Sequence, residues 1–208
     1  MSPLRTLLDA LDPLDLGVRE RLRPPAAPGD LQRVVALLPT SPPQPWLDLY
    51  AAHDGEGDAW VSGTFLDLKF MPLADVHAAL LEMQDHLQYT DSFEPDEPDP
   101  RTQQDYPSLG LLPIFDDMTG NYIGVDLQPG PAGVHGQAVV FGADYDGAKY
   151  VASSLNALFE WVTEQVQCGQ VLVQRPDSPV PPSFTLCECP QDPMGALIRR
   201  ARQDRPNV

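Results

Sequence analysis

The chain has 208 residues, 42% of them hydrophobic, so it is long enough to bury a substantial core. Its net charge of −17 disfavours nucleic acid and anionic membranes as partners. No apolar run approaches the roughly 20 residues of a membrane helix. The amino-terminal sequence lacks the apolar block of a signal peptide, so we expect a cytoplasmic protein.

The negative charge is concentrated in the middle of the chain. Residues 34–174 contain 21 acidic residues and three basic ones, a net charge of −18, whereas the flanking segments together carry +1. A field of this sign accelerates association with cationic partners. An acidic surface also keeps a protein soluble without any partner, so the charge alone leaves both interpretations open.

Three short helices are predicted near the amino terminus. Ser2 can cap the first, in which leucines recur at helical spacing. Asp30 can cap the second, which should end before Pro39. Pro45 can begin the third, which carries Trp46 on its apolar face.

The next part of the chain alternates between strand and helix patterns. Residues 59–70, AWVSGTFLDLKF, predict two short strands or one strand with a bulge. Residues 73–89 return to helical periodicity. The segment 90–108 has six acidic residues and four prolines, and we expect it to form a mobile surface loop.

Four short strands and a long helix are predicted further along the chain. Turn residues separate the strands, which indicates an antiparallel meander. Ser153 or Ser154 can cap the following helix, and Gly169 can end it. The apolar face of this helix must pack on the sheet. The predicted strands are residues 111–115, 122–127, 137–141 and 148–151.

These patterns predict an α+β fold, in which a mostly antiparallel mixed sheet packs against helices. We divide the chain into an amino-terminal helical segment packing on the main domain (1–30), a single domain (31–172) and an irregular, proline-rich tail (173–208). Within the tail, residues 194–202 can form a short helix. Three cysteines are too few for a disulfide framework or a zinc site, so we expect reduced thiols. They are Cys168, Cys187 and Cys189.

The stretch 113–130, PIFDDMTGNYIGVDLQPG, sets acidic residues among turn residues. A calcium loop beginning at Asp117 would need glycine at its sixth position and an acidic residue at its twelfth. Those positions hold Tyr122 and Gln128. A turn at Gly120 followed by a half-buried strand explains the same residues, so we assign no metal and no cofactor.

No catalytic motif is present, and no nucleophile is placed beside a base, so we assign no catalytic residue. The acidic loops and one tryptophan are instead candidates for binding a cationic protein. These candidates are Asp54, Glu56, Asp58, Trp60, Asp116, Asp117, Asp144 and Asp146. A rival hypothesis is a metal-dependent hydrolase, which would use Asp116, Asp117, Asp126, Asp144 and Asp146.

Three stretches of the chain together resemble the SMI1/KNR4 (SUKH) family, over about residues 31–169. They are ALLPTSPPQPWLDLYAAHDGEG, FLDLKFMPLADVHAAL and LLPIFDDMTGNYIGVDLQPGPAGVHGQAVVFGADYDGAKYVASSLNALFEWV. The family pattern falls on Pro113, Gly120, Asn121, Asp126, Gly136, Gln137, Ser153, Ser154, Leu158 and Phe159.

This resemblance implies a binding domain without catalytic activity. Bacterial members of the family resemble immunity proteins that neutralise toxins, and fungal members look like regulatory scaffolds. Our leading hypothesis is therefore an immunity-type protein that covers the basic surface of a toxin such as a nuclease. The alternative is a regulatory or scaffold protein of the same fold, with no toxin partner.

Overall fold

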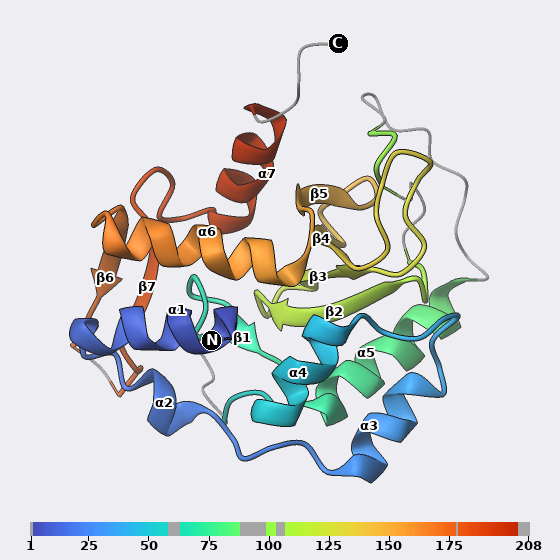
Figure 1. Cartoon of the computed structure of the whole chain (residues 1–208), viewed down its shortest axis with the longest axis horizontal. Helices are drawn as coiled ribbons and strands as arrows, with labels where there is room; N and C mark the ends of the chain where they lie inside the picture. The colour runs from blue at the N-terminus through green and yellow to red at the C-terminus, as the bar shows by residue number, and fades with distance from the viewer. Residues whose placement is uncertain (1, 58–62, 88–98, 103–106, 178, 204–208) are drawn as a thin grey trace.

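A computed structural model describes residues 2–57, 63–87, 99–102, 107–177 and 179–203 (Figure 1). Within these residues the chain forms the predicted α+β fold, with helices around an antiparallel sheet. The helices are α1 (Pro3–Leu11), the 3₁₀ helix η1 (Asp12–Leu14), α2 (Val18–Arg21), α3 (Pro28–Val35), α4 (Gln44–Ala52), α5 (Leu73–His86), α6 (Leu155–Gln167) and α7 (Pro193–Gln203). The strands are β1 (Lys69–Phe70), β2 (Leu111–Asp116), β3 (Asn121–Asp126), β4 (Gln137–Gly142), β5 (Lys149–Ala152), β6 (Val171–Gln174) and β7 (Ser183–Leu186).

Capping residues explain where two of the helices begin. The hydroxyl of Ser2 accepts a hydrogen bond from the backbone N–H of Arg5 at 3.3 Å, as predicted for α1. Ser154 caps α6 in the same way. The prediction for Asp30 is wrong, because α3 begins two residues earlier at Pro28, whose fixed φ suits a first helical position.

The main sheet has the strand order β1-β2-β3-β4-β5, and every neighbouring pair is antiparallel. The predicted meander is therefore confirmed. Among the described residues 63–70 of the predicted strand pattern, β1 is the only strand, and two isolated bridges precede it. Residues 59–62 of that prediction lie outside the described residues.

Helix α6 packs across the sheet and alongside α1 (Figure 1). Phe159 of α6 is 2% exposed and meets Phe65 and Phe115, with ring centroids 5.6 and 6.3 Å apart. Phe65 and Phe115 are themselves stacked at 4.3 Å. The predicted apolar face of α6 is thus buried against the meander.

The middle segment is only partly described. The helical periodicity predicted for residues 73–89 is confirmed by α5, on which Val76, Leu80 and Met83 are buried, whereas Leu87, just after the helix, is 40% exposed. Residues 90–98 and 103–106 of the predicted surface loop lie outside the described residues. Residues 99–102 are held in place, because the carbonyl of Arg101 accepts hydrogen bonds from Gly130 at 3.1 Å and Gln137 at 2.5 Å.

The segment that we expected to be irregular contains more regular structure than predicted. Strands β6 and β7 pair antiparallel, and α7 confirms the short helix expected at 194–202. Arg175 donates to the carbonyls of Leu14 and Asp15 at 2.6 and 3.1 Å, which ties this segment to the amino-terminal one. Within the described part of the chain, no helix is long and apolar enough to span a bilayer.

Replacing Phe159 by Ala should lower the free energy of unfolding by about 3–5 kcal/mol, because the change leaves a cavity beside the rings of Phe65 and Phe115. Chemical denaturation measures the effect. Glu160→Ala, at the exposed neighbouring position, is the matched control and should change stability little. Equal stabilities of the two variants would mean that the packing of α6 is misassigned.

Candidate functional site

The turn between β2 and β3 is built around the carboxylate of Asp117. This carboxylate accepts hydrogen bonds from the backbone N–H groups of Thr119 and Asn121, at 2.7 and 3.1 Å. It also accepts from the side chains of the same two residues, each at 2.8 Å. The turn and strand predicted here are confirmed, and protein groups already occupy the lone pairs of Asp117.

Asn121 joins this turn to the turn between β4 and β5. The side-chain nitrogen Nδ2 of Asn121 donates to the carboxylate of Asp144 at 2.7 Å, and its side-chain oxygen Oδ1 accepts from the backbone N–H of Asp144 at 3.0 Å. Asn121 is only 4% exposed, so the link is shielded from water. The structure thereby brings together two of the predicted acidic loops.

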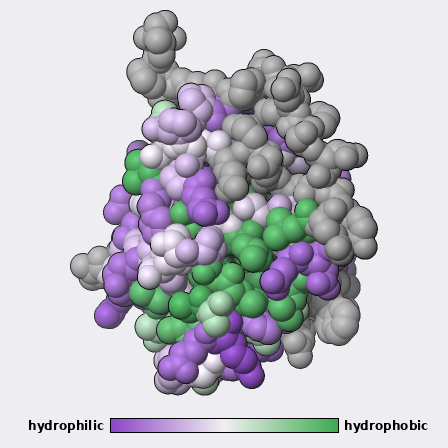
Figure 2. Space-filling model, turned by 90° about the vertical axis from the view of Figure 1, so that its right-hand side faces the viewer, coloured by the Kyte–Doolittle hydropathy of each residue, from purple (hydrophilic) through white to green (hydrophobic). Residues whose placement is uncertain are grey.

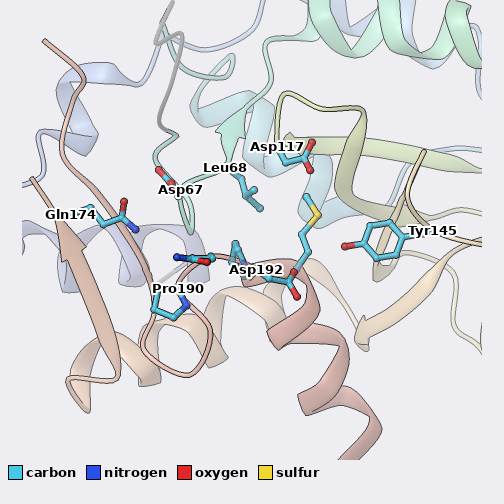
Figure 3. Close-up of a pocket in the computed structure, with 10 residues that line it drawn as sticks. Asp67, Leu68, Asp117, Tyr145, Gln174, Pro190 and Asp192 are labelled. Atoms are coloured by element: carbon cyan, nitrogen blue, oxygen red, sulfur yellow. The ribbon is translucent and has the colours of Figure 1, made fainter. Parts of the chain in front are cut away.

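An open pocket of about 490 Å³ lies between these turns and the carboxy-terminal segment. We call it the acidic pocket. Figure 3 shows Asp117 and Tyr145 on one side of it and Gln174 on the other. Its acidic lining residues are Asp67, Asp117 and Asp192, and its apolar ones include Leu68 and Met194.

The local electrostatic potential of the acidic pocket is negative. Burial, followed by the nearby carboxylates of Asp192, Asp117 and Asp144, raises the pKa of Tyr145 to about 12. Among the described residues that line the pocket, none is Lys or Arg. Arg199 lies 3.5 Å from Asp192 and offsets part of the charge. A cationic group would therefore be attracted to the pocket.

Asp116 and Asp146 flank this arrangement. Asp116 is half-buried and accepts from the backbone N–H of Met118 at 2.6 Å. Burial, with the charges of Asp117 and Asp75, raises its pKa against the opposing effect of the Met118 N–H and Lys69. Asp146 is exposed and forms an ion pair with Lys149.

Residues 54–57, which carry two of the predicted binding candidates, are turned toward the interior of the protein. Asp54 is half-buried and accepts from the backbone N–H of Leu73 at 2.9 Å, at the start of α5. Glu56 is fully buried, at 0% exposure. Both carboxylates serve internal contacts, so neither belongs to the acidic pocket. Asp58 and Trp60 lie outside the described residues.

Sequence reasoning missed Asp67, Tyr145 and Asp192. Tyr145 stands between two of the predicted residues, and its neighbours could have indicated it. Asp67 has φ 65° and belongs to a tight bend that the strand pattern concealed. Asp192 accepts from the backbone N–H of Gly195 at 2.7 Å at the start of α7, so its position could have been inferred as a helix cap.

The five acidic residues of the hydrolase hypothesis do not all converge, because Asp126 lies apart from the others. Asp126 stands at the opposite end of β3 from the Asp117 turn, roughly 17 Å away along an extended strand. It is fully buried and accepts from Gln128 and Gln137, at 2.9 and 3.1 Å. Within the described ranges, no three His, Cys, Asp or Glu side chains are placed to hold a metal ion.

Fold and site together define an acidic α+β domain with a polar pocket at one end of a meander. Residues 25–161 match the SMI1 / KNR4 family (SUKH-1), and the chain belongs to this family. The match begins before α3 and ends within α6, close to the span indicated by the sequence motifs.

Relatives of the chain include three fungal proteins. A KNR4/SMI1 homolog of Kluyveromyces lactis is 46% identical over 52 residues, which cover 25% of this chain and 10% of the relative. The cell wall biosynthesis/cell cycle regulator smi1 of Schizosaccharomyces pombe is 38% identical over 73 residues, 35% of this chain and 14% of the relative. The cell wall assembly regulator SMI1 of Saccharomyces cerevisiae is 41% identical over 49 residues, 24% of this chain and 10% of the relative. The chain thus matches only a small part of each of these relatives.

Asn121→Ala should lower the free energy of unfolding by about 1–3 kcal/mol, because it removes the hydrogen bonds by which this buried side chain joins Asp117 to Asp144. Denaturant titration measures the loss. Asp146→Asn, in the same β4–β5 turn, removes only an exposed ion pair and should cost far less. If both variants unfold like the wild type, the link between the turns does not stabilise the fold.

Calcium, magnesium or zinc should not raise the melting temperature of the wild type, because Asp117 is occupied by the turn and Asp126 by Gln128 and Gln137. Thermal melts with and without each ion measure this. Asp117→Ala and Asp126→Ala should respond to the ions as the wild type does. An increase seen in the wild type and lost in either variant would identify a metal site.

Proposed function

We propose that this protein is a non-enzymatic regulatory domain that binds another protein through the acidic pocket and its flanking turns. The observation that carries the proposal is the pocket itself, which is lined by three acidic side chains and, among the described residues, by no basic one. Membership of the family supports a regulatory role, since relatives are named regulators of the cell wall and the cell cycle.

The relatives favour regulation over toxin immunity. None of the three fungal relatives is named an immunity protein, and two are named regulators. The alternative in our sequence analysis therefore becomes the main proposal, and toxin neutralisation becomes the second candidate. A cytoplasmic location is part of the proposal, because free thiols such as Cys168, Cys187 and Cys189 suit a reducing compartment.

The proposed partner contributes a basic side chain to the acidic pocket. An arginine or lysine has a long apolar stem and a charged end. Leu68 and Met194 line the pocket but are only 4% and 3% exposed, so they offer little apolar surface for the stem. Asp67, Asp117 and Asp192 offer carboxylates for the charge. Charge complementarity of this kind sets the association rate and the specificity more than the final affinity.

A second surface feature is typical of protein-binding domains. Figure 2 shows a continuous hydrophobic area on the side of the molecule where α3 and the end of α5 lie in Figure 1. Contiguous apolar surface often marks a protein interface. In the part of the chain that the structure describes, the large exposed apolar side chains are Leu81, Leu87, Met118, Val134 and Leu172.

Replacing Asp144, Asp146 and Asp192 together by Asn should slow association with a fluorescent octa-arginine peptide several-fold at low ionic strength. The effect should fade at high salt, because screening removes long-range attraction. Stopped-flow fluorescence measures the rate. Asn can still accept the hydrogen bonds that Asp144 and Asp192 accept, so the variant should fold.

A matched control replaces the exposed residues Glu82, Glu160 and Glu164 by Gln, which removes the same charge from α5 and α6. Equal slowing by both triple variants would show that net charge, and not the pocket, attracts the peptide.

Deletion of the gene in its native host separates the two candidate functions. Loss of a regulator alters growth or the cell envelope without any added toxin. Loss of an immunity protein is harmful only when the toxin is present.

A further inference from the structure

Glu56 is a buried acidic residue that the proposed binding function does not use. Its backbone N–H donates to the carbonyl of Phe70 at 2.9 Å, and its carboxyl oxygen Oε1 accepts from the backbone N–H of Phe70 at 3.2 Å. Phe70 belongs to β1, the strand at the edge of the main sheet. Glu56 therefore provides hydrogen-bond partners for both the carbonyl and the N–H group of Phe70 at this sheet edge. Thr64 adds hydrogen bonds to the same carboxyl group.

The backbone around Glu56 also holds the amino-terminal segment. Glu56 forms an isolated bridge with Leu22. On either side of it, Arg23 donates to the carbonyl of Gly55 at 3.0 Å, and Gly57 donates to the carbonyl of Arg21 at 2.9 Å. The guanidinium of Arg21 donates to the carbonyl of Pro182 at 3.0 Å. The amino-terminal segment and the sheet edge thus meet at Glu56, and Arg21 joins the carboxy-terminal segment to the same place.

The carboxyl group of Glu56 is poorly suited to carrying a charge. Its second oxygen, Oε2, is buried and has no hydrogen-bond partner among the described residues. Burial raises the pKa of Glu56 to about 7, against the opposing effects of Thr64, Arg21 and the Phe70 N–H. Arg21, on α2, is the charged group that faces Glu56, and Arg21 in turn faces Asp67. An ionised Glu56 would leave a buried negative charge incompletely solvated.

We propose that Glu56 is a pH-sensitive latch, which holds the amino-terminal segment firmly when protonated and loosens it when ionised. The segment that it holds covers apolar surface of the family domain. Leu7 and Leu8 of α1 share a small apolar cavity of about 30 Å³ with Phe70 and Phe159. Loosening of the segment therefore exposes aromatic residues of the core, independently of any partner at the acidic pocket.

The direction of the pH effect follows from the two pKa values of Glu56. The folded value of about 7 lies above the ordinary value of 4.5, so the folded state binds the proton more tightly than the unfolded state does. The stabilisation is complete below pH 4.5 and is lost as the pH rises through about 7. Across that range the folding equilibrium constant should decrease on the order of a hundredfold from this group.

Hydrogen exchange tests the latch in the full chain. After correction for intrinsic exchange rates, the amides of Arg23, Gly57 and Phe70 should lose roughly tenfold or more of their protection between pH 5.5 and 8.5. Amides of the central strands, such as Ile123, should stay better protected than these three at both pH values, because they exchange only through more extensive unfolding. Glu56→Gln should abolish the pH dependence, whereas Glu20→Gln, at an exposed acidic position on α2, should retain it.

A second measurement does not require Glu56→Gln to fold. Carbon NMR of labelled glutamate carboxyl groups should show one group in the wild type that titrates near pH 7. Arg21→Met should move that titration to higher pH, because it removes the facing positive charge. The proposal is overturned if every glutamate titrates below about pH 5, or if protection at the three amides does not change with pH.

Discussion

The packing of Phe159 against Phe65 and Phe115 is the contact on which the rest of the structure depends. Phe115 lies on β2, inside the main sheet, so this contact fixes α6 across the meander. Phe65 precedes the tight bend at Leu66 and Asp67, where both residues adopt positive φ. Because the aromatic contact holds the start of this bend, it also positions Asp67 at the acidic pocket. A core interaction thus places one wall of a surface site.

The location of the pocket follows from the topology of the meander. In consecutive antiparallel strands, alternate turns emerge at the same end of the sheet. The β2–β3 and β4–β5 turns are such a pair, and Asn121 links them directly through Asp144. Asp126 and Gln137 pair across β3 and β4 at the other end, where they organise a different loop. Asp117 and Asp144 therefore lie at one end of the meander, and Asp126 lies at the other. The acidic pocket is at the end that carries Asp117.

Local patterns predicted those parts of the fold that local physics determines. The strands of the meander, the Ser154 cap and the apolar face of α6 all follow from periodicity and capping. The burial of Glu56 could not be predicted in this way, because it depends on the distant strand β1. The sequence pattern instead groups Glu56 with the acidic loops that could bind a partner. A Cβ atom at Gly55 would lie 2.3 Å from the backbone nitrogen of Pro72, so this glycine permits close packing. Asp192 was missed because prolines obscured the elements around it.

The boundary of the family match divides the acidic pocket into two parts. Asp67, Asp117 and Tyr145 lie inside residues 25–161, whereas Gln174, Asp192 and Met194 lie outside. The flanking segments hold each other, since Arg175 binds carbonyls of Leu14 and Asp15 and Arg21 binds that of Pro182. One wall of the pocket therefore belongs to the region that matches the family, and the other to the flanking segments. Under the proposed function, the residues that contact a partner come from both, so the family match alone does not define the proposed binding site.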